Sequence, residues 1–183
     1  MYQQSEDPWN FRNSAYEKKK YQRTIDIIRK IPVQSVLELG CSIGVLTKGI
    51  AKHVTYITAV DISQKAIEAA KETTREHEHI TFHVQDLKEG FDYGTFDLVL
   101  LSEICYYYHK DDLLKLLERC KDSLNSAGYV LLVHWTGFVR DYPLTGKQAH
   151  TLFQEQYVQT GQFKVVQKHQ EDLYELLLCQ LQH

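Results

Sequence analysis

Residues 35–47 read SVLELGCSIGVLT, an apolar run that contains Glu38 and continues into Gly40 and Gly44. This order is typical of a buried strand that turns sharply into a helix over a bound nucleotide. The two glycines let the backbone turn tightly and approach a ligand with no Cβ in the way. A helix that starts near Gly44 would aim its free amides and the positive end of its dipole at that ligand. The segment therefore predicts a nucleotide loop and leaves the nucleotide open.

The rest of the chain alternates between strand-type and helical segments, which is typical of an α/β fold with a mostly parallel sheet and helices on both faces. The expected strands are 33–39, 56–60, 80–84, 96–101, 129–135, 163–167 and 173–181. The expected helices are 13–31, 45–53, 64–77, 111–124 and 146–157, and Gly128 is expected to form the turn between a helix and the next strand. The last two strands are too close in sequence for a helix between them, so we expect an antiparallel hairpin at the end of a doubly wound, seven-stranded sheet.

Length and composition favour one domain over residues 1–183, with a helical segment at 1–31 ahead of an α/β core at 33–183. The formal charge of −3 does not favour a nucleic-acid surface. No apolar stretch is long enough to cross a membrane, and the N-terminus does not resemble a signal peptide. Four scattered cysteines without ligand spacing predict neither disulfides nor a metal site, and they favour the cytoplasm. No obligate protein partner is predicted.

Polar residues that follow successive strands are the candidate ligands, because the carboxyl ends of parallel strands form the binding edge of such sheets. Asp61 follows Gly40 by 21 residues, the spacing expected for an acid that binds ribose hydroxyls. A helix N-cap or a turn would also explain Asp61. Four successive strands present an acid or an imidazole in this way, which favours a binding site. These residues are Asp61, Asp86, the pair Ser102 and Glu103, and His134, and the strand before them contains Glu38.

The sequence of the loop also limits which nucleotide it could bind. A dinucleotide site requires GxGxxG, but Ser42 and Val45 occupy the second and third glycine positions. No GxxxxGK[ST] phosphate loop is present either. A ligand with a ribose and a base but no phosphates fits better, and S-adenosylmethionine is such a ligand.

The segments ELGCSIG, VDIS, VQDL and FDLVLLSEICYY together resemble the motifs of class I S-adenosylmethionine-dependent methyltransferases, over residues 33–135. The resemblance implies that the loop from Glu38 to Gly44, with Cys41 and Ser42, holds the methionine part of the cofactor. It implies that Asp61 binds the ribose hydroxyls and that the Ser102 carbonyl receives the ammonium. Ile62 and Leu87 would flank the adenine, and Asp86 would bind its amino group.

The flanking segments DPW, HW and DYPLTG resemble the nodulation protein S family more narrowly. Members of that family N-methylate the free amine of a partly deacetylated chitooligosaccharide. The resemblance implies an amine or amino-sugar substrate and no nucleic acid. An O-methyltransferase and a non-catalytic S-adenosylmethionine-binding protein remain alternatives, whereas the absence of an [N/D]PP[Y/F] sequence disfavours a base methyltransferase.

A protonated amine has no lone pair, so its methylation requires a base or a lowered amine pKa. We favour His134 as the base because imidazole titrates near the working pH, although a structural histidine would also fit there. Glu103 could orient the substrate ammonium and Asp141 could hold a sugar hydroxyl. Tyr106 and Tyr107 are hydroxyl or cation–π partners. At the N-terminus, Trp9 and Tyr16 are expected to close over the cofactor or to pack on the sheet.

Overall fold

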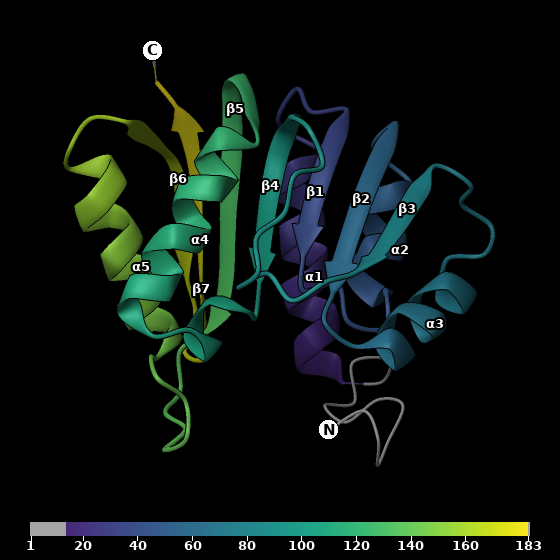
Figure 1. Cartoon of the computed structure of the whole chain (residues 1–183), viewed down its shortest axis with the longest axis horizontal. Coiled ribbons are helices and arrows are strands. Elements are labelled where there is room, and N and C mark those ends of the chain that lie inside the picture. The colour runs from purple at the N-terminus through teal and green to yellow at the C-terminus, as the bar shows by residue number, and fades with distance from the viewer. Residues whose placement is uncertain (1–13, 183) are drawn as a thin grey trace. The chain divides into compact units, whose positions relative to one another are not determined.

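The computed structural model describes residues 14–182. Its contacts divide the chain into two compact units, residues 1–86 and 87–183, and each is described by itself below (Figure 1). No helix among the described residues has both the length and the hydropathy needed to cross a membrane.

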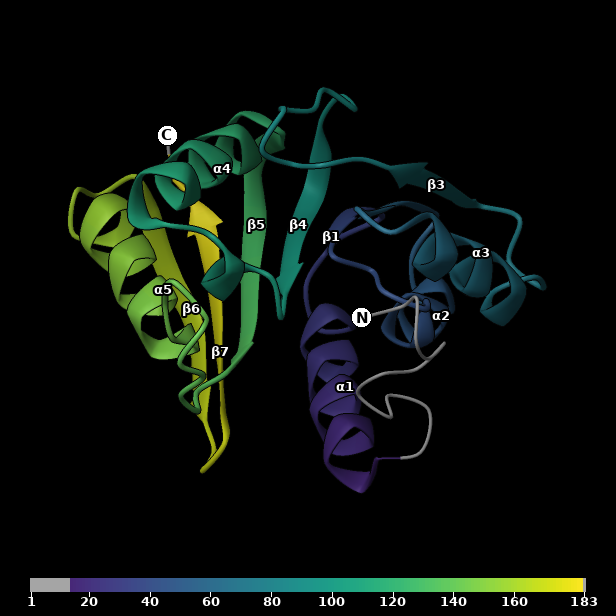
Figure 2. The same ribbon diagram turned by 60° about the horizontal axis from the view of Figure 1, so that its bottom comes forward.

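The first unit is a parallel three-stranded sheet with three helices. Its strands are β1 (Ser35–Leu39), β2 (Tyr56–Asp61) and β3 (Ile80–Val84), in the order β3-β2-β1. Its helices are α1 (Ala15–Ile28), α2 (Val45–Ala51) and α3 (Gln64–Thr73). Helices α2 and α3 pack on β2 and β3 (Figure 2), and α1 packs on α2. Residues from β1 and β2 form the buried centre of this unit because both faces of these parallel strands are covered.

The second unit is a mixed four-stranded sheet. Its strands are β4 (Phe96–Ser102), β5 (Leu124–Trp135), β6 (Phe163–Gln170) and β7 (Tyr174–Leu181), in the order β4-β5-β7-β6. Strand β4 is parallel to β5, and β7 is antiparallel to both β5 and β6. Helices α4 (Lys110–Asp122) and α5 (Gly146–Phe153) pack on this sheet (Figure 1). A 3₁₀ turn, η1 (Cys105–Tyr107), follows β4, and a π-helical turn, η2 (Gln154–Val158), extends α5.

These seven strands confirm the predicted α/β class, including the antiparallel C-terminal hairpin. One local prediction is wrong. Gly128 does not form a turn between a helix and a strand, because β5 already begins at Leu124 and includes it. The left-handed residue is Ala127, with φ of 59°. Gly128 is instead required by packing, since a Cβ there would lie 2.9 Å from the Asn125 carbonyl oxygen.

Candidate functional site

The loop between β1 and α2 has the sharp turn that its sequence predicts. Gly40, Ser42 and Gly44 all have left-handed backbones, with φ of 83°, 51° and 77°. The amides of Gly40 and Cys41 both donate to the Val60 carbonyl, at 2.8 and 3.0 Å, which ties the loop to the end of β2. Gly44 has a second role besides the expected turn: a Cβ there would lie 2.9 Å from Cα of Ala70 in α3. Gly44 therefore allows close packing of a helix, in addition to its left-handed backbone.

Glu38 points into the interior of the first unit and is only 1% exposed. The Thr47 hydroxyl of α2 donates to its Oε2 at 2.6 Å. Burial raises the pKa of the Glu38 carboxyl from 4.5 to about 7, although the Thr47 hydrogen bond opposes this shift. The carboxyl thus lies directly beneath the loop and exchanges its proton near neutral pH.

Asp61 and Ile62 lie side by side at the end of β2. The two carboxylate oxygens of Asp61 accept from the amides of Ser42 and Ser63, each at 2.9 Å. Each oxygen has two lone pairs, so the carboxylate, which also receives a backbone hydrogen bond from Ile62, keeps acceptor capacity for neighbouring hydroxyls. Burial raises the pKa of Asp61 and the backbone hydrogen bonds oppose that rise. Ile62 is 66% exposed.

Of the two local alternatives for Asp61, the turn is present, because its Oδ1 accepts from the amide two residues on, whereas the helix cap is not supported. Ser63 is the N-cap of α3, and its hydroxyl accepts from the Ala66 amide at 3.3 Å. Asp61 instead connects the loop after β2 to the loop after β1, because its carboxylate accepts from the amide of Ser42, 19 residues earlier in the sequence. An acid that organises the loop between β1 and α2 and lies beside an exposed apolar side chain is a suitable receptor for a nucleoside.

The remaining residues predicted to bind a cofactor are spread over both units. Asp86 is half-buried at the end of the first unit, and its backbone carbonyl accepts from the Gln85 side chain at 3.1 Å. Cys41, Leu87 and Ser102 are buried, and Ser102 is the last residue of β4. Tyr16 is half-buried on α1, with Nζ of Lys20 5.1 Å from its ring centroid. Trp9 lies outside the described residues.

Glu103 begins the polar cluster of the second unit, directly after β4. Its backbone is left-handed, with φ of 56°, a conformation that costs a residue with a Cβ about 1–3 kcal/mol and that clusters at functional sites. The Trp135 amide donates to both carboxylate oxygens, at 3.1 and 3.0 Å. The Tyr106 hydroxyl donates to Oε2 at 2.8 Å. The Glu103 carboxylate is thus held in a fixed position by β5 and by the turn that follows it.

Three tyrosines form an aromatic cluster beside Glu103. The rings of Tyr106 and Tyr142 stack, with centroids 5.0 Å apart and planes within 7° of parallel. Tyr107 meets both rings edge-on, at 4.8 Å each, and its hydroxyl is 3.2 Å from that of Tyr142. Burial raises the pKa of both Tyr106 and Tyr107, so their phenols stay protonated. Our sequence reasoning missed Tyr142, although the DYPLTG motif contains it.

His134 does not have the geometry of a general base. It is fully buried, and its Nε2 lies 3.1 Å from the amide nitrogen of Cys105. A backbone N–H can only donate, so Nε2 must accept and its lone pair is occupied. The second ring nitrogen, Nδ1, lies 3.0 Å from Nε2 of His150. We therefore replace our interpretation of His134 as the base with a structural role, the alternative that the sequence also allowed.

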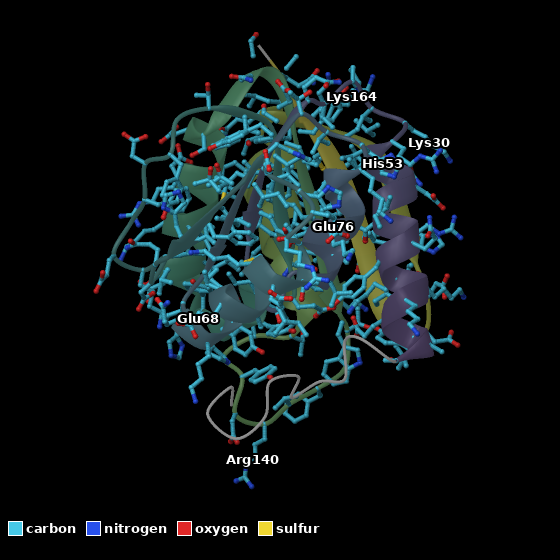
Figure 3. All side chains as sticks on the ribbon, turned by 90° about the vertical axis from the view of Figure 1, so that its right-hand side faces the viewer. Lys30, His53, Glu68, Glu76, Arg140 and Lys164 are labelled. Carbon is cyan, nitrogen blue, oxygen red and sulfur yellow. The ribbon has the colours of Figure 1, made fainter. Side chains whose placement is uncertain are left out.

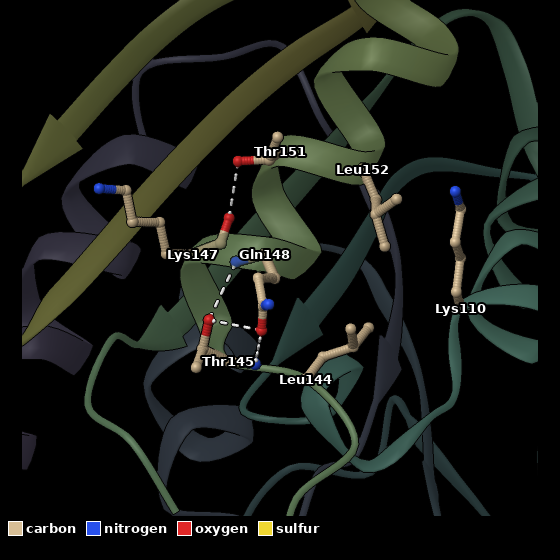
Figure 4. Close-up of a pocket in the computed structure, with 7 residues that line it drawn as sticks. All are labelled: Lys110, Leu144, Thr145, Lys147, Gln148, Thr151 and Leu152. Carbon is tan, nitrogen blue, oxygen red and sulfur yellow. Dashed lines mark hydrogen bonds between the residues drawn. The ribbon is translucent and has the colours of Figure 1, made fainter.

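Asp141 and the pocket beyond it belong to the segment between β5 and α5. Asp141 is exposed, and its neighbour Arg140 projects outward from the loop (Figure 3). A hollow of about 400 Å³ lies at the N-terminal end of α5 (Figure 4). Leu144 is one of its lining residues, and the Leu144 amide donates to the Tyr106 carbonyl at 3.4 Å. The full lining is Lys110, Leu144, Thr145, Lys147, Gln148, Thr151 and Leu152.

Comparison with solved structures shows the class of this fold. The N-methyltransferase NodS from Bradyrhizobium japonicum WM9, in complex with S-adenosyl-L-homocysteine, superposes with a TM-score of 0.82. The match covers 97% of this chain and 93% of that one at 19% identity. The chain therefore has a methyltransferase fold.

The family follows from the sequence. A model of the family described as nodulation protein S (NodS) matches residues 3–132, and the chain belongs to this family. Nodulation protein S of Sinorhizobium fredii (strain NBRC 101917 / NGR234) is 28% identical over 104 residues, which are 56% of this chain and 48% of that protein. A ubiquinone biosynthesis O-methyltransferase of Coxiella burnetii (strain Dugway 5J108-111) is 28% identical over 95 residues, 51% of this chain and 40% of the relative. The chain spans about half the length of the curated relatives it matches.

Proposed function

We propose that this protein is an S-adenosylmethionine-dependent methyltransferase that N-methylates an amine of a small molecule or amino sugar. The observation that carries the proposal is the pairing of Asp61, a carboxylate with acceptor capacity, with the exposed apolar side chain of Ile62. Membership of the nodulation protein S family supports the choice of an amine.

The first unit supplies most of the residues proposed to bind the methyl donor. Asp61 accepts the ribose hydroxyls, Ile62 covers one face of the adenine and Asp86 accepts from its amino group. The loop from Glu38 to Gly44 holds the methionine part, because its left-handed residues turn the backbone sharply and bring it close to a ligand. When bound, S-adenosylmethionine supplies a methyl group that its sulfonium already activates. In the second unit, Leu87 and the Ser102 carbonyl keep their predicted roles at the adenine and the ammonium.

The second unit supplies the residues proposed to bind the methyl acceptor. Glu103 attracts the substrate ammonium, because its carboxylate is the anionic group beside the three tyrosines. It also accepts the proton of the ammonium, because the lone pair of His134 is occupied. The faces of Tyr107 and Tyr142 attract the same cation through their ring electrons. Asp141 and the hollow at α5 provide further contacts for a larger acceptor. The protein thus orients the amine and removes its proton.

Calorimetry with S-adenosylmethionine tests the donor site. Wild type should bind, and Asp61→Ala should weaken binding at least about tenfold, the effect of losing hydrogen bonds to a charged group. Asp26→Ala, which removes a carboxylate of α1 whose side chain is 41% exposed, is the matched control and should bind as wild type does. Absence of binding by the wild-type protein would exclude this cofactor.

A methyl-transfer assay then distinguishes the acceptors. Glucosamine oligomers and simple amines should be methylated, whereas phenols should not. The likeness to the ubiquinone biosynthesis O-methyltransferase keeps O-methylation as a second candidate, and turnover of phenols alone would favour it. Binding of the cofactor without transfer to any acceptor would instead indicate a non-catalytic binding protein.

We also propose a cytoplasmic location. All four cysteines are free thiols and all are buried, which supports a reducing compartment. Fractionation of cells that express the native protein would test this, and recovery in an exported fraction would contradict it.

A further inference from the structure

Four polar side chains form a continuous row inside the second unit. His134 lies on β5, His150 on α5, Glu175 on β7 and Lys168 on β6. The first three are 0%, 1% and 3% exposed, whereas the Lys168 side chain is 45% exposed. The proposed function uses none of their protons. We call His134, His150 and Glu175 the histidine–glutamate chain.

The hydrogen bonds of this chain have one possible direction. Since the Cys105 amide donates to Nε2 of His134, that ring is neutral and carries its proton on Nδ1. Nδ1–H then donates to Nε2 of His150 at 3.0 Å, so His150 is also neutral and carries its proton on Nδ1. That nitrogen faces Oε1 of Glu175 at 3.6 Å, which is too long for a hydrogen bond but close enough for the carboxylate charge to favour a proton on Nδ1. Nζ of Lys168 lies 2.8 Å from the same oxygen.

The surrounding packing keeps these partners in register. His134 and Glu175 are directly opposite each other on the antiparallel strands β5 and β7. Gly146 starts α5 against the end of β5, where a Cβ would lie 2.1 Å from the Trp135 carbonyl oxygen and 2.8 Å from Cβ of His134. The absence of that Cβ lets α5 lie close enough for His150, one turn later, to reach the His134 ring.

At its inner end the chain supports the turn that carries Glu103. Cys105 is the first residue of η1, and the N–H groups at the start of a helix have no partner within it. His134 provides that partner. The adjacent Trp135 amide holds the Glu103 carboxylate, and the Tyr106 ring packs edge-on against the His134 ring at 5.7 Å. The opposite tautomer would place an N–H of His134 against the N–H of Cys105.

We propose that His150 and Glu175 are positioning residues that fix the tautomer of His134 and thereby hold the turn from Glu103 to Tyr106 in its working geometry. This inference rests on the proposed function only where it assigns Glu103 to the methyl acceptor. His150 and Lys168 lower the pKa of Glu175 to about 2, against the effect of its burial, so the carboxylate remains ionised at neutral pH. The negative charge at the outer end therefore favours the proton on Nδ1 of His150, and the Cys105 amide at the inner end favours the proton on Nδ1 of His134.

Nitrogen NMR of the histidine rings tests the tautomers without any substrate. In wild type, His134 and His150 should each be protonated on Nδ1 alone. Glu175→Gln introduces an amide that can donate as well as accept, so the second tautomer of His150, and with it that of His134, should become populated. Glu171→Gln is the matched control, because it neutralises a carboxylate outside the histidine–glutamate chain, whose Oε1 lies 3.1 Å from Nε2 of His169. It should leave both rings unchanged.

Kinetics of the same variants test whether the tautomers affect methyl transfer through the turn from Glu103 to Tyr106. Glu175→Gln should lower kcat about five- to tenfold, as expected for the loss of one orienting hydrogen bond, with the Kd of S-adenosylmethionine unchanged. Wild-type His134 protonated on Nε2 would overturn the proposal, and so would Glu175→Gln with unaltered tautomers and kcat. If Glu175→Gln does not fold, the wild-type spectrum still decides the tautomer. Absence of transfer by wild type would count against the proposed function and not against the hydrogen-bond direction.

Discussion

Replacing Glu38 by glutamine should change how the stability of the protein depends on pH. The Glu38 carboxyl has a pKa of about 7 in the folded protein, against 4.5 ordinarily, because it is buried on β1 beneath the nucleotide loop. A raised folded pKa means that its stabilising contribution is complete below pH 4.5 and is lost as the pH rises through 7. At about 1.4 kcal/mol per pKa unit, this difference corresponds to about 3 kcal/mol.

The measurement is urea denaturation of wild type and Glu38→Gln without cofactor, at intervals from pH 4.5 to 8.5. The free energy of unfolding of the variant, relative to wild type, should increase by about 3 kcal/mol from the lower to the upper end of this range. Other titrating groups are common to both proteins and cancel in this difference. Glu78→Gln, which neutralises an exposed carboxylate of the same unit, is the control.

A difference between Glu38→Gln and wild type that stays constant with pH would refute the reasoning, because Glu38 would then have the same pKa folded and unfolded. A difference that falls with increasing pH would show that the Thr47 hydrogen bond outweighs the desolvation of the carboxyl. Either result would mean that the interior beneath the loop is more polar than its burial indicates.

Two further variants test the second unit. Gly146→Ala should reduce the free energy of unfolding by about 1–3 kcal/mol in urea denaturation, because the new Cβ forces α5 away from Trp135. Lys147→Ala, at the exposed neighbouring position, is the control and should have little effect. Equal losses of stability in the two variants would contradict this explanation. Tyr142→Ala should raise the KM for an amine acceptor about tenfold and leave the Kd of S-adenosylmethionine unchanged, because it removes one ring of the aromatic cluster. Tyr56→Ala, at an exposed tyrosine of the first unit, is its control, and an unchanged KM in Tyr142→Ala would exclude the cluster as part of the acceptor site.

Local patterns in the sequence were sufficient to predict the elements of the fold. The apolar runs that became β1 to β5 and the helical stretches between them differ from the observed bounds mostly at their ends, where caps and packing decide the last residues. Strand β5 is the exception, since it begins five residues early. The left-handed backbone of Ala127 lets the chain continue through that position without a separate turn. The spacing from Gly40 to Asp61 similarly anticipated an acid that organises the nucleotide loop, because both ends of that spacing follow neighbouring parallel strands.

The chemistry of individual side chains was decided by partners that are distant in sequence. The residues next to His134 in the sequence are compatible with both a general base and a structural histidine. Only Cys105 and His150, 29 and 16 residues away, determine that its Nε2 accepts a hydrogen bond. Glu103 likewise depends on Trp135, 32 residues away. Thus the sequence by itself determined the strands, the helices and the candidate donor loop, because these depend on the periodicity of neighbouring residues. The tertiary structure decided which groups are buried, which lone pairs are occupied and where protons reside, because desolvation and hydrogen bonding depend on what the fold places against each side chain.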